Sequence, residues 1–121
     1  DSNTLERAYA DELGVTAAFN LNVLRRVNSL LSADFDLRDW QHCARFNAEK
    51  SRVEMHLNAK RNLVVNFHGH QRLFKKDESI HTENSYKWSI PKFTNLLLQS
   101  GFTNTRHWTD QKSHYALFWA S

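Results

Sequence analysis

One short segment, residues 82–87 (TENSYK), carries side chains that suit the binding of a small polar ligand. In an extended strand alternate residues share a face, so Glu83 and Ser85 lie on one side and their neighbours on the other. A carboxylate beside a hydroxyl pairs an acceptor with a donor, which complements an imidazole ring with one N–H and one acceptor nitrogen. Glutamate and serine are also common on solvated strand edges. The spacing alone therefore favours a solvated edge and leaves a ligand site as the alternative.

Residues 68–70 (HGH) suggest a metal site, since the chain has seven histidines. Zinc sites usually need three or four ligands in closed geometry, and neither a second ligand pair nor a partner cysteine is apparent at suitable spacing. A polar turn between two strands explains these residues better, and we expect no metal. The one cysteine, Cys43, cannot form an internal disulfide, and its surroundings in the sequence favour a small buried apolar residue over a nucleophile.

The chain's four tryptophans could form a platform for stacking bases: Trp40, Trp88, Trp108 and Trp119. No RNP-like or helix-turn-helix pattern accompanies them, and the 16 Lys and Arg residues are interleaved with 13 acidic ones. Core packing and cross-strand pairing explain the tryptophans better, because aromatic residues favour strands. We therefore expect no nucleic-acid partner. No apolar run approaches the roughly 18 residues of a membrane span, so we expect no membrane partner either.

Helical periodicity dominates the first part of the chain and returns once later. Residues 4–12 are expected to form one helix, and a second follows Gly14, with Thr16 as its cap. Its apolar residues recur at intervals of three and four, which predicts one buried face. These residues are Phe19, Val23, Leu24, Val27, Leu30 and Leu31. A third helix is expected between Pro91 and Gly101, which stand just inside its start and just past its end.

Between these helices the pattern changes to alternation, which predicts strands. The clearest case places Val53, Met55 and Leu57 on one face. Further strands are expected at residues 44–47, 62–67, 71–74 and 79–88, and a closing hairpin at 103–108 and 114–119. This order predicts an α+β fold with a mainly antiparallel sheet, packed helices and a C-terminal β-hairpin. With 121 residues and no repeat or linker, the chain is expected to be a single domain, residues 1–121.

Several segments form a linked set of motifs in a characteristic order. They are residues 8–11 (AYAD), 14–24 (GVTAAFNLNVL) with Asn28, 33–36 (ADFD), 52–57 (RVEMHL), 80–87 (IHTENSYK), and 101–102 (GF) with the last hairpin. In order and separation they resemble the histidine-specific S-adenosylmethionine-dependent methyltransferases, which include the histidine N-alpha-methyltransferases of ergothioneine biosynthesis. The resemblance covers nearly the whole chain, and a linked set is far more specific than any one motif.

In that family a Rossmann-type lobe binds S-adenosylmethionine and a second lobe holds the amino acid. The resemblance implies that this chain is the C-terminal, substrate-binding part of the second lobe, without the cofactor lobe. It also implies that Tyr9 contacts the backbone end of the substrate, that Glu83 and Ser85 hold its imidazole, and that Met55 forms an apolar wall. The implied activity is methylation of the α-amine of histidine, with S-adenosylmethionine bound mainly by the other lobe. The chain itself has three glycines and no G-x-G-type loop.

Direct methyl transfer to an amine needs no covalent nucleophile, so no catalytic residue is expected in this chain. The chain starts at Asp1 and its only methionine is Met55, so we expect it to be part of a longer protein. As a fragment it is expected to expose an apolar junction and to form dimers. A single cysteine fits a cytoplasmic location. Two alternatives remain: a stand-alone ligand-binding or interaction domain, and a related methyltransferase with a different amino-acid or amine acceptor.

Overall fold

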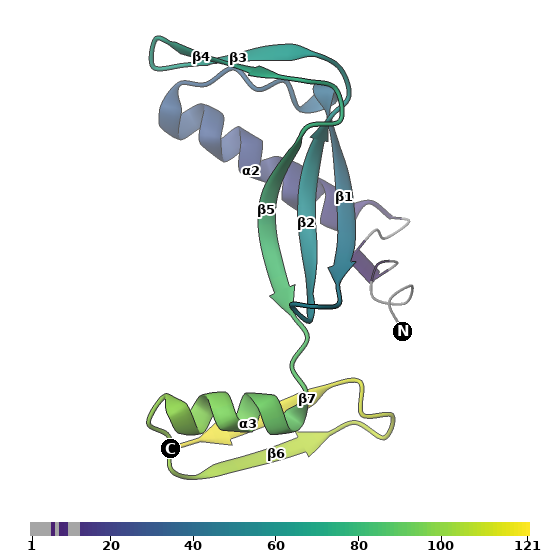
Figure 1. Ribbon diagram of the computed structural model, residues 1–121, viewed down its shortest axis with the longest axis vertical. Coiled ribbons are helices and arrows are strands. Elements are labelled where there is room, and N and C mark those ends of the chain that lie inside the picture. Colours follow the sequence, from purple (N-terminus) through teal and green to yellow (C-terminus); the bar gives the residue numbers. More distant parts are fainter. Residues whose placement is uncertain (1–5, 7, 10–12) are drawn as a thin grey trace. The chain divides into compact units, whose positions relative to one another are not determined.

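The computed structural model describes Glu6, Ala8, Tyr9 and residues 13–121. The chain divides into two compact units, Asp1–Tyr86 and Lys87–Ser121 (Figure 1). The helix predicted over residues 4–12 lies mostly outside the described residues, but Glu6, Ala8 and Tyr9 are helical. No helix in the described part of the chain is both long enough and apolar enough to cross a lipid bilayer.

Helix α2 (Val15–Leu31) begins and ends at residues in the left-handed conformation. Its N-cap is Gly14, with φ of 69° and no side-chain cap, so the prediction that Thr16 caps the helix was wrong. Glycine adopts this conformation without the steric cost that a side chain brings, and the helix therefore starts one residue before Thr16. In the last turn of the helix, the Asn28 side chain accepts a hydrogen bond from the Phe35 N–H at 2.9 Å and donates to the Phe35 carbonyl at 2.8 Å. This pair of bonds holds the loop that follows α2 against the helix.

The buried face of α2 differs from the predicted one. Leu24 is 2% exposed, as expected, but Phe19, Val23, Leu30 and Leu31 are exposed, Phe19 by 61%. At 3.6 residues per turn, Phe19, Val23 and Leu30 form a stripe about 100° away from the face that carries Asn20 and Leu24. The spacing of the apolar residues predicted that this stripe is buried. The sheet instead covers the face that contains the fully buried Asn20.

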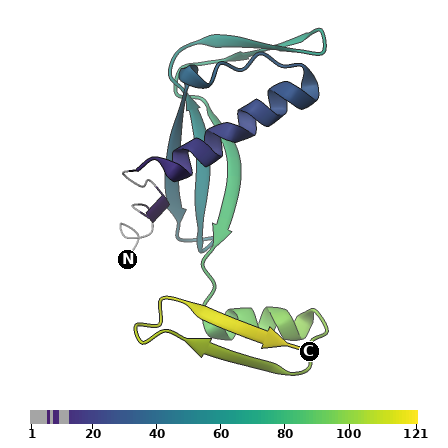
Figure 2. The same ribbon diagram turned by 180° about the vertical axis from the view of Figure 1, so that it is seen from behind.

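The first unit is built on a three-stranded antiparallel sheet. A 3-10 turn, η1 (Leu37–Asp39), leads into β1 (Trp40–Asn47), which pairs with β2 (Arg52–Ala59), and β2 pairs with β5 (Ser79–Tyr86). Burial alternates along β2 as predicted, and Val53, Met55, Leu57 and Ala59 are buried. Strand β1 starts four residues before the predicted strand and includes Cys43, which is half-buried rather than buried. Helix α2 crosses one face of this sheet (Figures 1 and 2).

Strands β3 (Leu63–Phe67) and β4 (His70–Phe74) form a separate hairpin in the first unit. Phe67 pairs with His70, which leaves His68 and Gly69 as a two-residue loop with φ values of 45° and 76°. Positive φ at both positions is the geometry of the tight hairpin turn that matches the twist of two strands. The predicted polar turn at residues 68–70 is therefore confirmed.

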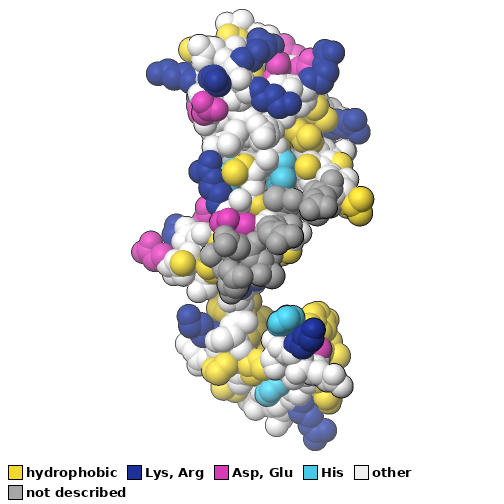
Figure 3. All heavy atoms as spheres, turned by 90° about the vertical axis from the view of Figure 1, so that its right-hand side faces the viewer, with side chains coloured by type: hydrophobic (Ala, Val, Ile, Leu, Met, Phe, Trp, Pro, Cys, Tyr) yellow, Lys and Arg dark blue, Asp and Glu magenta, His cyan; other side chains and the backbone are white. Residues whose placement is uncertain are grey.

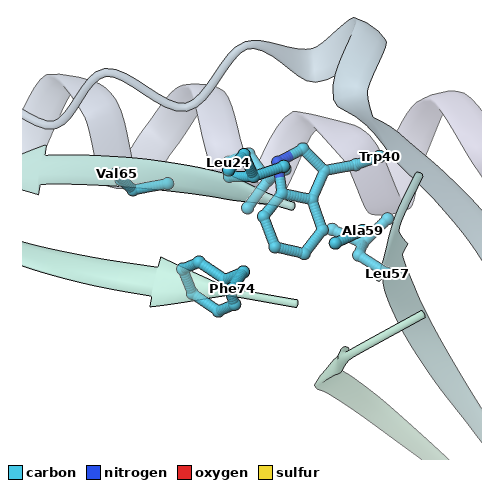
Figure 4. Packing of buried hydrophobic residues seen from close by; sticks show 7 residues of the cluster. Leu24, Trp40, Leu57, Ala59, Val65 and Phe74 are labelled. Carbon is cyan, nitrogen blue, oxygen red and sulfur yellow. The ribbon is translucent and has the colours of Figure 1, made fainter. Parts of the chain in front are cut away.

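Trp40 lies at the centre of the hydrophobic core of the first unit. Its ring meets that of Phe74 edge to face, with centroids 5.0 Å apart, and Figure 4 shows Leu24, Leu57 and Ala59 around it. The buried cluster consists of Leu24, Trp40, Leu57, Ala59, Leu63, Val65 and Phe74. Helix α2, the sheet and the β3–β4 hairpin all contribute to it, so this one cluster holds the three layers together.

The second unit consists of α3 (Ile90–Gln99) and the hairpin of β6 (Thr105–Thr109) with β7 (Ala116–Ala120). Phe93 of α3 meets Phe118 of β7 edge to face, with centroids 4.7 Å apart. Trp108 and Trp119 lie on the opposite face of the hairpin and are about half exposed. The two units together confirm the predicted α+β fold with antiparallel sheets and a C-terminal hairpin.

Candidate functional site

A β-bulge in β5 sets the positions of Glu83 and Ser85. Ser85 pairs with Val53 and Glu83 with Met55, but the register then shifts, so that His81 pairs with His56. Thr82 is the extra residue, and its hydroxyl donates a hydrogen bond to the Met55 carbonyl at 2.9 Å. Directly paired residues share a face, so Glu83 and Ser85 lie on the face that also carries Val53 and Met55. The prediction that Glu83 and Ser85 point the same way is confirmed.

Tyr9 reaches this face from the N-terminal segment. Its hydroxyl lies 2.7 Å from the Ser85 Oγ, a hydrogen bond between residues 76 positions apart in the chain. The structure thus brings Tyr9, Met55, Glu83 and Ser85 to one face of the sheet. Met55 is 3% exposed and Ser85 is half-buried, whereas Glu83 is exposed. Glu83 is therefore the exposed member of this set, and it lies on the same face as the two hydroxyls.

The Glu83 carboxylate is available to a ligand. Within the described part of the chain it makes no hydrogen bond or ion pair, although the Glu83 backbone carbonyl lies 3.2 Å from the His81 Nε2. A carboxylate only accepts hydrogen bonds, whereas a hydroxyl both donates and accepts. The Glu83 carboxylate and the Ser85 hydroxyl together therefore suit a small ring that carries one N–H and one acceptor nitrogen.

Sequence reasoning missed two residues that hold Tyr9 in place, His42 and Asn20. The His42 Nε2 lies 2.9 Å from the Tyr9 carbonyl, and its Nδ1 lies 2.9 Å from the Asn20 Nδ2. A signal was present, because Asn20 is a poor helix former inside a helix. A polar residue in that position indicates a buried hydrogen bond, which apolar periodicity does not detect.

The opposite face of the sheet carries a cluster of charged and polar side chains. The Arg52 Nη2 lies 2.7 Å from the Glu54 Oε1, and the Glu54 Oε2 lies 3.3 Å from the His56 Nε2. The hydrogen bond from Arg52 lowers the pKa of Glu54 to about 2. Burial lowers the pKa of His56, with Glu54 opposing the shift, and the nearby His81 and Arg45 lower it further. Glu54 is thus a firmly ionised carboxylate beside an imidazole whose pKa is lowered.

Glu54, His56 and His81 place possible metal-binding atoms within 4.8 Å of one another. The Glu54 carboxylate already accepts hydrogen bonds from Arg52 and Asn47. The two imidazole rings are stacked, with centroids 4.6 Å apart and planes 21° apart. Their in-plane lone pairs therefore run side by side instead of converging on one ion, and we do not assign a metal to this cluster.

The stability of the chain is expected to fall as the pH drops from about 7 to about 5. The unfolded state presents His56 with an ordinary pKa of about 6.5, whereas the fold lowers that pKa, so the unfolded state binds the proton first. The Tm should therefore decrease more steeply with falling pH in the unaltered chain than in His56→Gln, as measured by circular dichroism. Glu54 stays ionised throughout this range. Equal slopes for the two proteins would contradict the prediction.

Two further regions do not have the features of a ligand site. An apolar cavity of about 260 Å³ lies between α2 and the β3–β4 hairpin, and the Arg72 that lines it stacks on Phe74 and pairs with Glu78 at 2.9 Å. On the face drawn in Figure 3, Lys and Arg side chains are mixed with carboxylates. Among the described ion pairs, Arg61 pairs with Asp39 at 2.6 Å. Such pairing disperses the positive charge of the chain.

The glycines of this chain do not form a cradle for a nucleoside cofactor. Each has a positive φ at a turn or helix end, and a Cβ added to any of them would meet nothing within 4 Å. A cofactor loop instead places glycine where a bound group approaches the backbone closely, between a strand and a helix. The three glycines therefore do not provide the close backbone approach that such a cofactor loop needs.

Comparisons with known proteins identify relatives of this chain. The chain is 40% identical over 119 residues to the histidine N-alpha-methyltransferase of Mycolicibacterium smegmatis, and 37% identical over 127 residues to that of Mycobacterium tuberculosis. It is 32% identical over 116 residues to the N-methyltransferase fsqC of Aspergillus fumigatus. The first two alignments cover 97% of this chain and 37% of each relative, and the third covers 95% and 31%. The chain thus spans about a third of the length of these relatives.

The family described as histidine-specific methyltransferase, SAM-dependent, matches residues 1–121. This match extends over the whole chain and therefore includes the sheet face that carries Tyr9, Met55, Glu83 and Ser85. The chain belongs to the histidine-specific, S-adenosylmethionine-dependent methyltransferase family.

Proposed function

We propose that this chain is the substrate-binding part of a protein that methylates the α-amine of histidine, as in ergothioneine biosynthesis. S-adenosylmethionine would supply the methyl group from a Rossmann-type lobe outside these residues. Within this chain, Glu83 and Ser85 hold the imidazole, Tyr9 contacts the backbone end of the amino acid, and Met55 forms an apolar wall. We propose a cytoplasmic location for the longer protein, because the chain has a single cysteine.

The observation that carries this proposal is the 2.7 Å contact between the Tyr9 hydroxyl and the Ser85 hydroxyl, with Glu83 beside Ser85 on the same face. Residues from the N-terminal segment and from β5 thereby supply two hydroxyls and a carboxylate to one small surface. The names of the two mycobacterial relatives support histidine as the substrate.

Positioning is the task of these residues. An α-amino group has a pKa of about 8, so part of it is neutral near pH 7 and no strong base is required. Rigid binding of the ring and of the backbone end of the substrate fixes the position of the amine. This raises the rate by lowering the entropy cost of aligning the amine with the methyl group. An apolar side chain at this surface would leave the Glu83 carboxylate without a hydrogen-bond donor, which is how such a site would select histidine.

A different acceptor is the second candidate. The Aspergillus relative is named only as an N-methyltransferase, and at 32% identity it matches 95% of this chain. A shared substrate lobe therefore does not by itself imply a shared substrate. A stand-alone binding domain would instead bind its ligand without any cofactor lobe.

Incubating the 121-residue chain with histidine and S-adenosylmethionine is expected to yield no methylated histidine. The reason is that its glycines form no cofactor loop. The measurement is mass spectrometry of the products, and the control is a protein that joins this chain to a Rossmann-type lobe. Methylated histidine from the chain alone would contradict the proposal that a separate lobe binds the cofactor. Its absence from the joined protein would contradict histidine as the substrate.

A further inference from the structure

Asn20 of α2 lies between two acceptors and appears nowhere among the proposed substrate contacts. It is 1% exposed, and its Nδ2 lies 2.9 Å from the His42 Nδ1 and 3.1 Å from the His56 carbonyl. A carbonyl oxygen only accepts hydrogen bonds, so the amide nitrogen, not the amide oxygen, must face His56. Both hydrogens of this nitrogen are then used, one toward each partner.

The orientation of Asn20 determines the protonation of His42. Because Asn20 donates to it, the His42 Nδ1 must be an unprotonated acceptor. A neutral imidazole then carries its proton on Nε2, and this N–H points to the Tyr9 carbonyl 2.9 Å away. That carbonyl also only accepts, so both partners of His42 require the same neutral form. The hydrogen bonds run in one direction from Asn20 through His42 to Tyr9.

We propose that His42, fixed by Asn20 in its Nε2-protonated neutral form, is a positioning residue for Tyr9. The inference rests on the proposed role of Tyr9 in substrate binding. Tyr9 is tied to β1 through its carbonyl and to β5 through its hydroxyl. In the sheet order β1-β2-β5, this places Tyr9 across β2, at the level of Met55.

A second contact keeps the same segment on β1. The Glu6 carboxylate accepts a hydrogen bond from the Phe46 N–H at 2.9 Å. This contact fixes the segment along the strand, whereas His42 fixes the peptide of Tyr9 itself. Loss of the His42 bond should therefore leave the segment attached but let the Tyr9 ring move relative to Ser85.

The experiment compares two replacements of His42. In His42→Gln the amide oxygen accepts from Asn20 and the amide nitrogen donates to Tyr9, so both bonds are retained. In His42→Leu both bonds are lost. In a protein that joins this chain to a Rossmann-type lobe, His42→Leu should raise the KM for histidine about 2- to 10-fold with little change in kcat. His42→Gln should stay close to the unaltered protein, and His70→Leu, in the β3–β4 hairpin, is the matched control.

Nuclear magnetic resonance of the 121-residue chain tests the inference without reference to activity. Nitrogen shifts of the His42 ring should report the Nε2-protonated form. The nuclear Overhauser effect between the Tyr9 ring and Ser85 should persist in His42→Gln and weaken in His42→Leu. If His42→Leu does not fold, two measurements still test the inference. They are the protonated nitrogen of His42 in the unaltered chain and the Tyr9–Ser85 contact in His42→Gln.

Three results would overturn the inference: a proton on the His42 Nδ1, loss of the Tyr9–Ser85 contact in His42→Gln, or an unchanged KM in a folded His42→Leu protein. Failure of the proposed function looks different. In that case the joined protein would not methylate histidine at all, while the His42 ring form and the Tyr9–Ser85 contact would still support the positioning role.

Discussion

Replacing Glu83 with alanine is expected to lower kcat/KM for histidine about 10- to 150-fold in a protein that joins this chain to a cofactor lobe. The change would remove the proposed hydrogen bond between this charged acceptor and the imidazole N–H, and such bonds are worth about 1.5–3 kcal/mol. Glu83 is exposed, and no described residue pairs with its carboxylate. The substitution should therefore affect the ligand more than the fold. Steady-state kinetics with histidine and with other amino acids measures the effect.

Two variants make this result specific. Asn84→Ala alters the neighbouring residue on the other face of β5, opposite Glu54, and should leave histidine use unchanged. Tyr9→Phe should weaken all amino-acid substrates, because Tyr9 is proposed to contact the part that they share, and it should add a smaller loss for histidine, because it also removes the hydroxyl that bonds Ser85. The decisive quantity is the ratio of histidine to other amino acids. An unchanged ratio in Glu83→Ala would mean that Glu83 does not hold the imidazole and lies on a solvated strand edge.

Leu57→Ala is expected to reduce the free energy of unfolding by about 2–5 kcal/mol, because it leaves a cavity in the core. Leu57 is 0% exposed and belongs to the cluster around Trp40. Leu73→Ala is a matched control, since Leu73 is a leucine of β4 that is 60% exposed. It should cost less than about 1 kcal/mol. Urea unfolding followed by far-ultraviolet circular dichroism measures both, and equal losses would contradict the assignment of the core.

The sequence predicted the features that depend on local spacing. Alternation at Val53, Met55 and Leu57 identified β2 and its buried face, because side chains in a strand alternate whatever surrounds them. The shared face of Glu83 and Ser85 followed from the same rule. Pro91 and Gly101 correctly bracketed α3, since these residues have restricted or special backbone conformations.

Features that depend on packing between distant segments could not be predicted in this way. The buried side of α2 is set by the sheet that covers it, and that side contains Asn20, which hydrophobic spacing passes over. The bulge at Thr82 has no local signal, yet it determines which residues lie opposite Met55. Tyr9 was identified by resemblance alone. Its contact with Ser85 joins segments 76 residues apart, and no periodicity connects them.

The contact between Tyr9 and Ser85 joins two hydroxyls, either of which can donate. Rotating two protons reverses its direction without moving a heavier atom. For a neutral ring held by Glu83 and Ser85, Ser85 donates to the ring nitrogen and accepts from Tyr9. For an imidazolium, Ser85 accepts from the ring and donates to Tyr9. If Glu83 and Ser85 hold the ring as proposed, the pair of hydroxyls can match either charge state, and binding should tolerate the change in charge that histidine undergoes between about pH 6 and 7.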